Sequence, residues 1–504
     1  MRRLLKLSEP LLRFAYDQAV EDPRDGLTLF GPLDAGKPYG IRAGVIGTAA
    51  GIEQFKRWVE WVQGSVRALN AEISRPPFPG FESAFRIPWS AAPVLIRTID
   101  EEELHRRLFL DDRHQRVFGT VSLYADPIIA ARDEEDVKPD IWFVVIPDIV
   151  RKYCRPKSVV EPEVRQAARK LFSSPADAKR FFREPSLFTD QNVAAEPYFY
   201  KEHFRDQLKA KLLTHRIATQ VLQESTLENI NVPGENRRDQ ARAKRQSEIA
   251  WNICTAAFYK SGGRPWKVAG IREGVCYVGL VYKKDDRDGD NRSACCGAQM
   301  FLDSGDGVVF KGAVGPWYNT ETENFHLSRN AARELAALVL KSYKERRDNR
   351  APSEVFLHGQ ARFDREEWRG FEEAIGSETT MVGVTIRDNA NLKLFRKTNN
   401  PVLRGIAYIR DERNAFLWTR GWTPRLQTYP GREVPNPLSL EISQGTASIE
   451  TVLNDVHALT KLNYNTCIFG DGKPITLKFA HAVGEVLTAG PVSGVPPLPF
   501  MYYI

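Results

Sequence analysis

Apolar runs and one amphipathic stretch define the first half of the chain. Residues 39–48 form a short apolar run that ends near glycine, and residues 140–150 form a nearly continuous one. Such a run is typical of a parallel strand that is covered on both faces. Residues 51–66 repeat apolar side chains at helical spacing, and the charged stretch 159–185 is also predicted to be helical. Residues up to about 255 therefore predict one doubly wound α/β layer.

The pattern changes after this point. Three predicted strands come first, and then a helix, a strand, a helix and a strand follow, which is the element order of an RNase H-like fold. Ser328 is the expected N-cap of the first helix. The predicted strands and helices span 274–284, 293–303, 307–312, 328–348 (helix), 353–359, 364–375 (helix) and 379–388.

The composition is that of an ordinary globular protein with a mild basic excess. The chain has 504 residues, enough for about two to four domains, with 42% hydrophobic and 27% charged residues. The net charge of +7 is compatible with a polyanionic partner but does not establish one. We find no apolar window that could span a bilayer, and Glu9, Pro10 and Arg13 interrupt any signal-peptide core. We expect a cytoplasmic protein without membrane contact.

The cysteines give no sign of a metal site. The six cysteines form no CxxC pair and have no zinc-ligand spacing. Cys295 and Cys296 lie in an apolar, strand-like run, which predicts buried thiols. This usage is typical of a reducing compartment.

The chain ends with the apolar residues PPLPFMYYI. We expect this end to be docked against the body of the protein. Docking would hold the α-carboxylate of Ile504 as a fixed negative group that can bind a cation. Packing alone is an equally good explanation of these residues.

Residues 203–220, HFRDQLKAKLLTHRIATQ, contain a candidate phosphate site. Arg205 and Lys209 are one helical turn apart and share a face, and Gln220 follows eleven residues later. Lys260, before a glycine pair, supplies a third cation. Two or three cations with one amide suit a terminal phosphate. The alternative is a solvated helix with scattered charges.

This spacing resembles the 5′-phosphate pocket in the MID domain of Argonaute proteins, and AAFYKSGGRPWKV is similar to the junction between MID and PIWI. The resemblance covers essentially the whole chain and is closest to short prokaryotic Argonautes. It implies an α/β fold with a linker segment (1–35), a Rossmann-like MID domain (36–255) and an RNase H-like PIWI domain (256–504). The other similar stretches are DPRDGLTLFGPL, FPGFESAF, STLENI, GPWYN and KLNYNTCIFGDGKPITLKFA.

The resemblance also implies a guide site. The 5′-phosphate of a small guide RNA would be bound by Arg205, Lys209, Gln220 and Lys260, with a Mg²⁺ ion held by Gln220 and Ile504. Arg205 departs from the histidine expected in the nearest relatives, so its role is the least certain of the four. Further contacts to the nucleic-acid backbone are expected from Lys211, Arg237, Arg238, Arg242, Lys244 and Arg245. The alternative for this basic stretch is a solvated surface helix.

The acidic residues with which slicing Argonautes hold two metal ions are missing. Val281 and Gln360 stand where the family has aspartates, and His481 is the only candidate for the last ligand. One histidine without carboxylates does not make a two-metal site. We therefore expect no nuclease activity from this chain. A residual nuclease and a basic scaffold without a guide are the less favoured alternatives.

The output would then come from a partner. The resemblance implies a separate APAZ-domain effector, most closely a TIR-APAZ NADase, that is activated when the guide pairs with single-stranded DNA of an invading plasmid or phage. The complex would form an oligomer of heterodimers and deplete NAD⁺ in an abortive-infection response. A sirtuin-like or DNase effector is the alternative, because the effector is another polypeptide.

Overall fold

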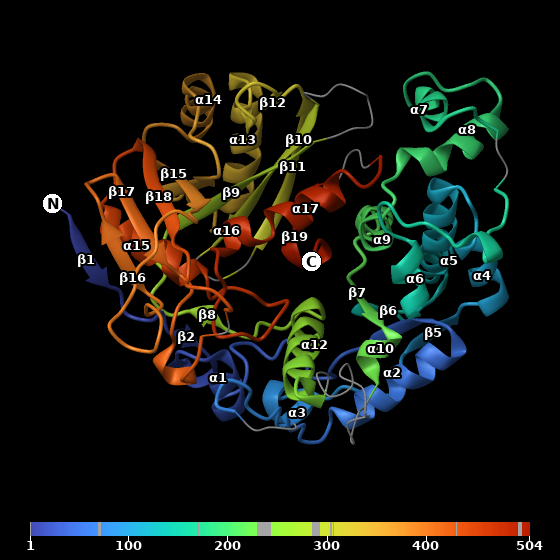
Figure 1. Cartoon of the computed structure of the whole chain (residues 1–504), viewed down its shortest axis with the longest axis horizontal. Helices are drawn as coiled ribbons and strands as arrows, with labels where there is room; N and C mark the ends of the chain where they lie inside the picture. Colours follow the sequence, from blue (N-terminus) through green and yellow to red (C-terminus); the bar gives the residue numbers. More distant parts are fainter. Residues whose placement is uncertain are drawn as a thin grey trace.

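The structure is a computed structural model in which the two largest sheets are joined through a shared core (Figure 1). In the described part of the chain, no helix has the length and apolar character needed to cross a membrane. The structure describes residues 2–68, 72–168, 171–228, 243–284, 293–302, 305, 307–429, 431–491 and 496–504.

The first half forms a four-stranded parallel sheet in the order β5-β4-β6-β7. Side chains of β4 and β6 alternate between two cores, because successive residues of a strand point to opposite faces. Helix α2 covers one face, and α5 and α9 cover the other. The elements are β4 (Ala43–Gly47), β5 (Leu95–Thr98), β6 (Ile141–Ile146), β7 (Thr219–Gln223), α2 (Ala49–Trp61), α4 (Glu101–Leu108), α5 (Arg113–Glu134), α6 (Asp148–Tyr153) and α9 (Phe204–Leu213).

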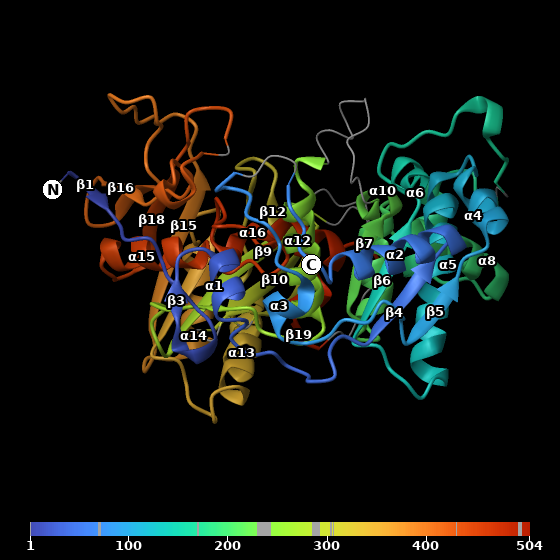
Figure 2. The ribbon, with the colours of Figure 1, turned by 90° about the horizontal axis from the view of Figure 1, so that it is seen from below.

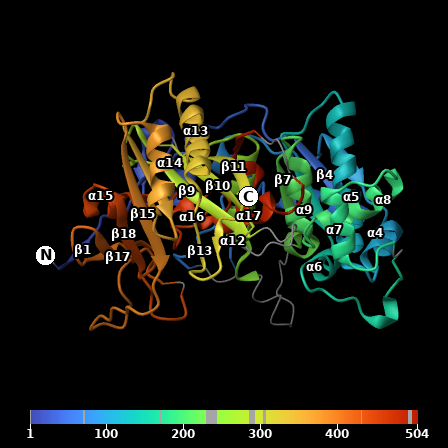
Figure 3. The ribbon, with the colours of Figure 1, turned by 90° about the horizontal axis from the view of Figure 1, so that it is seen from above.

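The second half is built on a ten-stranded sheet with the order β1-β16-β17-β18-β15-β14-β9-β10-β11-β19. Helices α13 and α14 cover one face, and α15, α16 and α17 cover the other (Figures 1 and 3). The strands are β9 (Val275–Lys284), β10 (Ala294–Phe301), β11 (Gly307–Gly315), β14 (Glu354–Gly359), β15 (Thr380–Asp388), β16 (Ile406–Ile409), β17 (Asn414–Trp418), β18 (Leu438–Gly445) and β19 (Leu498–Pro499). The helices are α13 (Arg329–Glu345), α14 (Arg365–Ile375), α15 (Ile449–Leu459), α16 (Ile475–Lys478) and α17 (Ala480–Leu487).

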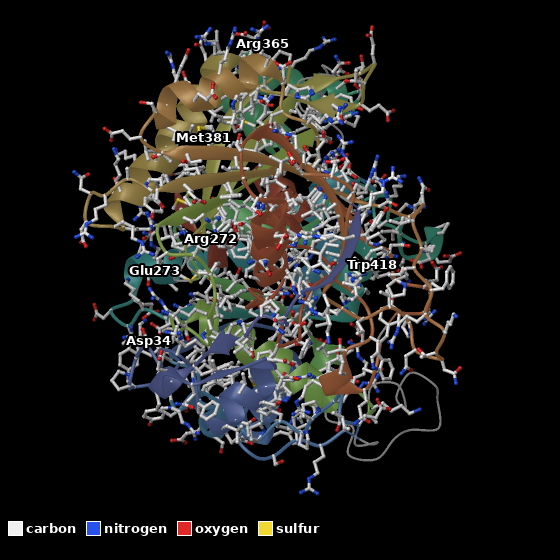
Figure 4. The ribbon with its side chains drawn as sticks, turned by 90° about the vertical axis from the view of Figure 1, so that its left-hand side faces the viewer. Asp34, Arg272, Glu273, Arg365, Met381 and Trp418 are labelled. Atoms are coloured by element: carbon white, nitrogen blue, oxygen red, sulfur yellow. The ribbon has the colours of Figure 1, made fainter. Side chains whose placement is uncertain are left out.

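This architecture confirms the predicted fold class, a Rossmann-like sheet followed by an RNase H-like one. Strand β14 pairs in parallel with both β9 and β15, whereas β9, β10 and β11 are antiparallel. Ser328 caps α13 as predicted, because its Oγ accepts a hydrogen bond from the Ala331 amide at 3.3 Å. Figure 4 shows this half with Arg272 labelled, whose guanidinium joins Glu354 of β14 to Asp455 of α15.

One predicted helix is wrong in part. Within 159–185 the described residues form only a 3₁₀ turn (Pro162–Val164) and helix α7 (Pro175–Arg183), because both start at a proline, which is tolerated only in a first helical turn. Within 203–220, where Arg205 and Lys209 are expected to share a helix face, helix α9 ends at Leu213. Arg216 then adopts a left-handed φ of 53°, and the chain enters β7.

The N-terminal segment is fastened to the RNase H-like half (Figures 1 and 2). Strand β1 (Arg3–Lys6) pairs with β16, and β2 (Leu12–Arg13) lies between β3 (Ala19–Val20) and β8 (Lys267–Val268). The predicted boundary between residues 255 and 256 falls inside α12 (Gln246–Lys260), whose side chains pack in the core that the two halves share.

A buried ion cluster holds this segment in place. Arg404 Nε donates to the two oxygens of Glu9 at 3.0 and 3.1 Å, and Lys461 Nζ lies 2.9 Å from the same carboxylate. Burial alone would raise the pKa of Glu9, but Arg404 and Lys461 hold it at about 2. Glu9 is therefore ionised across the physiological range and neutralises two buried cations.

Candidate nucleic-acid interface

The four side chains predicted to bind a phosphate line one cavity of about 390 Å³. Arg205 and Lys209 lie on α9, Gln220 on β7 and Lys260 at the end of α12. The buried Ile504 lines the same cavity, so the expected docking of this apolar end is confirmed. Figure 1 shows why these elements meet: the C-terminus lies between the two sheets, beside β7 and α9.

Lys260 lies at the floor of this phosphate pocket. Its Nζ donates to Gln220 Oε1 and to the main-chain oxygen of Ile504, both at 2.7 Å, and to the Thr219 carbonyl at 3.3 Å. The side chain is only 2% exposed. Burial lowers the pKa of Lys260 well below its usual value, and the charge of Arg205 lowers it further.

Lys209 has weaker partners. Its Nζ lies 3.3 Å from the Thr219 carbonyl and 3.4 Å from the Thr219 hydroxyl, and the side chain is 3% exposed. Burial lowers its pKa well below the usual value, and Lys260 and Arg205 add to this. Within the described residues no Asp or Glu side chain forms an ion pair with either lysine, and the terminal carboxylate of Ile504 contacts Lys260. A buried ammonium without a counter-ion is unfavourable, so the pocket is suited to receive an anion.

Arg205 occupies the more open side of the pocket. Its guanidinium contacts the Tyr503 carbonyl at 3.3 Å and Asp206 at 3.2 Å. His203 caps α9 and lies 2.8 Å from the same Asp206 carboxylate. Burial raises the pKa of Asp206, but His203 and Arg205 lower it below its ordinary value. Asp206 thus balances His203 and Arg205, and it forms no ion pair with Lys209 or Lys260.

The sequence reasoning missed two arginines of this pocket. Arg151 and Arg155 also line it, on and just after α6. Arg151 Nη1 donates to Gln223 Oε1 at 2.6 Å, and Gln223 Nε2 donates to Asp148 at 2.7 Å. A signal was available, because these residues follow the apolar strand 140–150, and ligands of α/β sheets bind beyond the carboxyl ends of strands.

Lys211 does not reach the phosphate pocket. Its Nζ donates to Ser122 Oγ at 2.9 Å and lies 3.8 Å from the ring centre of Phe118, so the side chain packs on α5. Lys211 is therefore engaged within the protein, and its contact with the nucleic-acid backbone stays a prediction. This orientation follows from helical geometry, since residues two apart do not share a face.

A larger basic cleft of about 840 Å³ lies beside the start of α12. Arg245 lines it and pairs with Glu248 at 3.0 Å, whereas Lys244 is exposed outside it. Arg420 and Arg432 also line it, and in the chain as described they have no hydrogen bond or ion pair. Unpaired arginines in a cleft suit a phosphate backbone. The other predicted contacts, Arg237, Arg238 and Arg242, lie outside the described residues.

The phosphate pocket also continues toward the position of the nuclease site. An open cleft of about 1010 Å³ shares His203 and Arg205 with it, and contains Lys283, Lys284 and Tyr318 on the other side. The Lys284 ammonium lies 3.6 Å from the ring centre of Tyr318. Single-stranded nucleic acids bind such surfaces through their phosphates, which contact the cations, and through their bases, which stack on the aromatic rings.

Of the three predicted nuclease positions, His481 lines this cleft. Gln360 follows β14 and is exposed, and His481 lies in the first turn of α17 with its side chain 78% exposed. These two line a pocket of about 300 Å³ together with Glu323. Val281 on β9 is 1% exposed and packs in the core near α17. Over the residues that the structure covers, no cluster of three or more His, Cys, Asp or Glu side chains could hold a metal.

Comparisons with known proteins identify the fold. No protein-family model matches the chain, and no curated protein sequence matches it significantly. Among solved structures, Clostridium butyricum Argonaute bound to a guide DNA and a 19-mer target DNA is similar over 100% of this chain, with a TM-score of 0.63 and 14% identity. A. aeolicus Argonaute (TM-score 0.53, 14% identity, 99% of this chain) and Drosophila Piwi (TM-score 0.55, 13% identity, 100% of this chain) are also similar.

The match is to a part of those proteins. This chain covers 55% of the Clostridium and A. aeolicus chains and 56% of Drosophila Piwi, so it spans about half of their length. The fold of this chain is that of the MID and PIWI domains of Argonaute proteins.

Proposed function

We propose that this chain is a short Argonaute that binds the 5′-phosphate of a small guide RNA through Arg205, Lys209, Gln220 and Lys260. The observation that carries the proposal is the pair of buried lysines that face a cavity with no Asp or Glu partner. Hydrogen bonds from ammonium groups to phosphate are charge-assisted and strong, and they strengthen where water is excluded. The Gln220 amide would add a directional hydrogen bond to the phosphate.

We also expect a Mg²⁺ ion in the same pocket, held by Gln220 and Ile504. Gln220 Oε1 and the terminal oxygen of Ile504 both lie 2.7 Å from Lys260 Nζ, so both oxygens face the pocket side of the same ammonium group. Oxygen atoms are the ligands that Mg²⁺ prefers, with water and phosphate completing its shell. When bound, the ion would neutralise phosphate charge, and Lys260 would then turn from these oxygens to the phosphate.

The guide and its target would follow two basic clefts. The cleft with Lys283 and Lys284 shares His203 and Arg205 with the pocket, and the second cleft contains Arg245, Arg420 and Arg432. Such contacts hold the backbone, while base pairing reads the sequence of a single-stranded DNA target. The Argonaute from Clostridium butyricum, which shares the fold, was solved with a guide and a target, which supports a nucleic-acid partner.

We further propose that the chain does not cut its target. The positions considered for metal ligands carry Val281, Gln360 and His481, and Val281 is buried away from the pocket that holds the other two. We expect no cleavage of a fully paired DNA target with Mg²⁺ or Mn²⁺ present. Specific, guide-dependent product on a denaturing gel would contradict this, and would make Glu323 the first carboxylate to mutate.

The response to a target would then belong to a separate APAZ-domain effector, most closely a TIR-APAZ NADase. Target binding would have to favour an active state of the complex. This active state would be detected as loss of NAD⁺ in the presence of guide and target. The resemblance of the sequence supports this part of the proposal. Loss of DNA instead of NAD⁺ would identify a nuclease effector.

The decisive experiment compares one small RNA with a 5′-phosphate or a 5′-hydroxyl, each with Mg²⁺ or with chelator. We expect the phosphorylated RNA to bind at least tenfold more tightly, about 1.4 kcal/mol, and the chelator to reduce this preference. Gln220→Ala should make binding less sensitive to the chelator. Equal binding of the two RNAs would mean that the cations form only a basic surface.

A further inference from the structure

The phosphate pocket holds more positive charge than one phosphate needs. Lys209 and Lys260, which are buried, and Arg205 account for the proposed contacts to a single phosphate group. The exposed Arg151 and Arg155 line the same cavity and have no role in that arrangement. Among the described residues, no Asp or Glu side chain lines the cavity, and the terminal carboxylate of Ile504 contacts Lys260. The charge of the two additional arginines is therefore not neutralised by an acidic side chain of the pocket.

The two additional arginines are placed to act together. Arg151 lies on α6 and Arg155 follows the C-cap residue Cys154, and both side chains line the same cavity. Arg151 is held in position through Gln223, which is itself anchored on Asp148, by bonds of 2.6 and 2.7 Å. The Arg155 side chain has no hydrogen bond or ion pair to any residue that the structure describes. Arg151 is thus preorganised, and the guanidinium of Arg155 is available to bind a ligand.

We propose that the pocket is built for a guide RNA with a 5′-triphosphate, an inference that rests on the proposed function. The two buried lysines and Arg205 bind the phosphate next to the ribose, and Arg151 and Arg155 bind the two phosphates beyond it. Arginine is suited to this role because its planar guanidinium binds phosphate oxygens in pairs and stays charged. Each added phosphate brings further negative charge to the two additional arginines.

This proposal also states which reaction supplies the guide. A 5′-triphosphate marks the first nucleotide that an RNA polymerase incorporates. Guides would come from template-directed RNA synthesis with their original 5′ end, and not from cleavage or kinase treatment of a longer RNA.

The test uses one RNA sequence with a 5′-triphosphate, a 5′-monophosphate or a 5′-hydroxyl, bound to the full chain. The triphosphate is checked for integrity after binding. The wild-type chain should bind the triphosphate at least as tightly as the monophosphate. In Arg151→Ala with Arg155→Ala, triphosphate binding should fall about tenfold and monophosphate binding less than about threefold. The control variant Arg333→Ala with Lys341→Ala removes two exposed charges of α13. It should change neither the triphosphate affinity nor the monophosphate affinity.

Three results would overturn the inference. The wild-type chain could reject the triphosphate, or the double variant could keep its triphosphate affinity. An equal loss of affinity for all three RNAs would mean that the arginines contact the sugar–phosphate backbone of the guide and not its 5′ end. A wild-type chain that fails to prefer monophosphate over hydroxyl refutes the proposed function itself, so the two failures are distinguishable.

Discussion

Replacing Lys209 by methionine is expected to weaken binding of a 5′-phosphorylated guide about 10- to 100-fold and to stabilise the empty protein by about 1 kcal/mol. Lys209 is buried without a counter-ion, and its acceptor, the Thr219 carbonyl, keeps a bond from Lys260. Methionine fills the same space without the cost of desolvating a charge. Guide titrations should show a log–log salt slope smaller by about 0.7, and urea denaturation gives the stability.

Lys211→Met is the matched control, because it changes a lysine of the same helix that contacts Ser122 and Phe118 instead of the pocket. It should keep the discrimination between phosphate and hydroxyl and should not stabilise the protein. If Lys209→Met binds both RNAs as the wild-type chain does, the assignment of the pocket is wrong even though the fold stands.

Replacing Glu9 by glutamine is expected to lower the free energy of unfolding by about 3 kcal/mol. The substitution leaves Arg404 and Lys461, which are 8% and 3% exposed, without the carboxylate that neutralises them. Because the cluster joins the N-terminal segment to the PIWI half, limited proteolysis should cut this segment first. Urea denaturation at pH 7 measures the loss.

The same variant should also respond differently to acid. The pKa of Glu9 is about 2 in the folded chain and 4.5 ordinarily, so its stabilisation is complete above about pH 4.5 and is lost as the pH falls toward 2. Burial and Arg404 also lower the pKa of His457, to about 3, which adds a loss of stability below about pH 6.5. The acid-induced loss should therefore be smaller in Glu9→Gln, but not absent.

Glu450→Gln is the control for the cluster. It removes an exposed ion pair between Arg3 of β1 and α15, and such pairs contribute about 0–1 kcal/mol. A similar loss of stability in both variants would mean that any contact of the N-terminal segment matters equally. A Glu9→Gln protein as stable as the wild type would show that the buried cluster is not what fastens the segment.

The sequence by itself determined the order of the elements and the identity of the phosphate-site cations. The apolar run at 140–150 became β6, and the succession after residue 255 became the RNase H-like sheet, because periodicity records which faces are buried. The spacing of Arg205 and Lys209 fixed a shared helix face. The prediction of a helix over 159–185 was wrong in part, because Pro162 and Pro175 each start a separate short element.

Only the tertiary structure decided what those cations face. Gln220 joins them from a neighbouring strand, and Lys260 from a helix of the shared core, so their meeting depends on packing between distant segments. Burial without an Asp or Glu partner, the outward turn of Lys211 and the arrival of Arg151 and Arg155 are properties of that packing. The pairing of β1 with β16, which lies some four hundred residues later in the chain, is another property of that packing. Periodicity reports that a residue is buried, but it does not report which residue lies opposite.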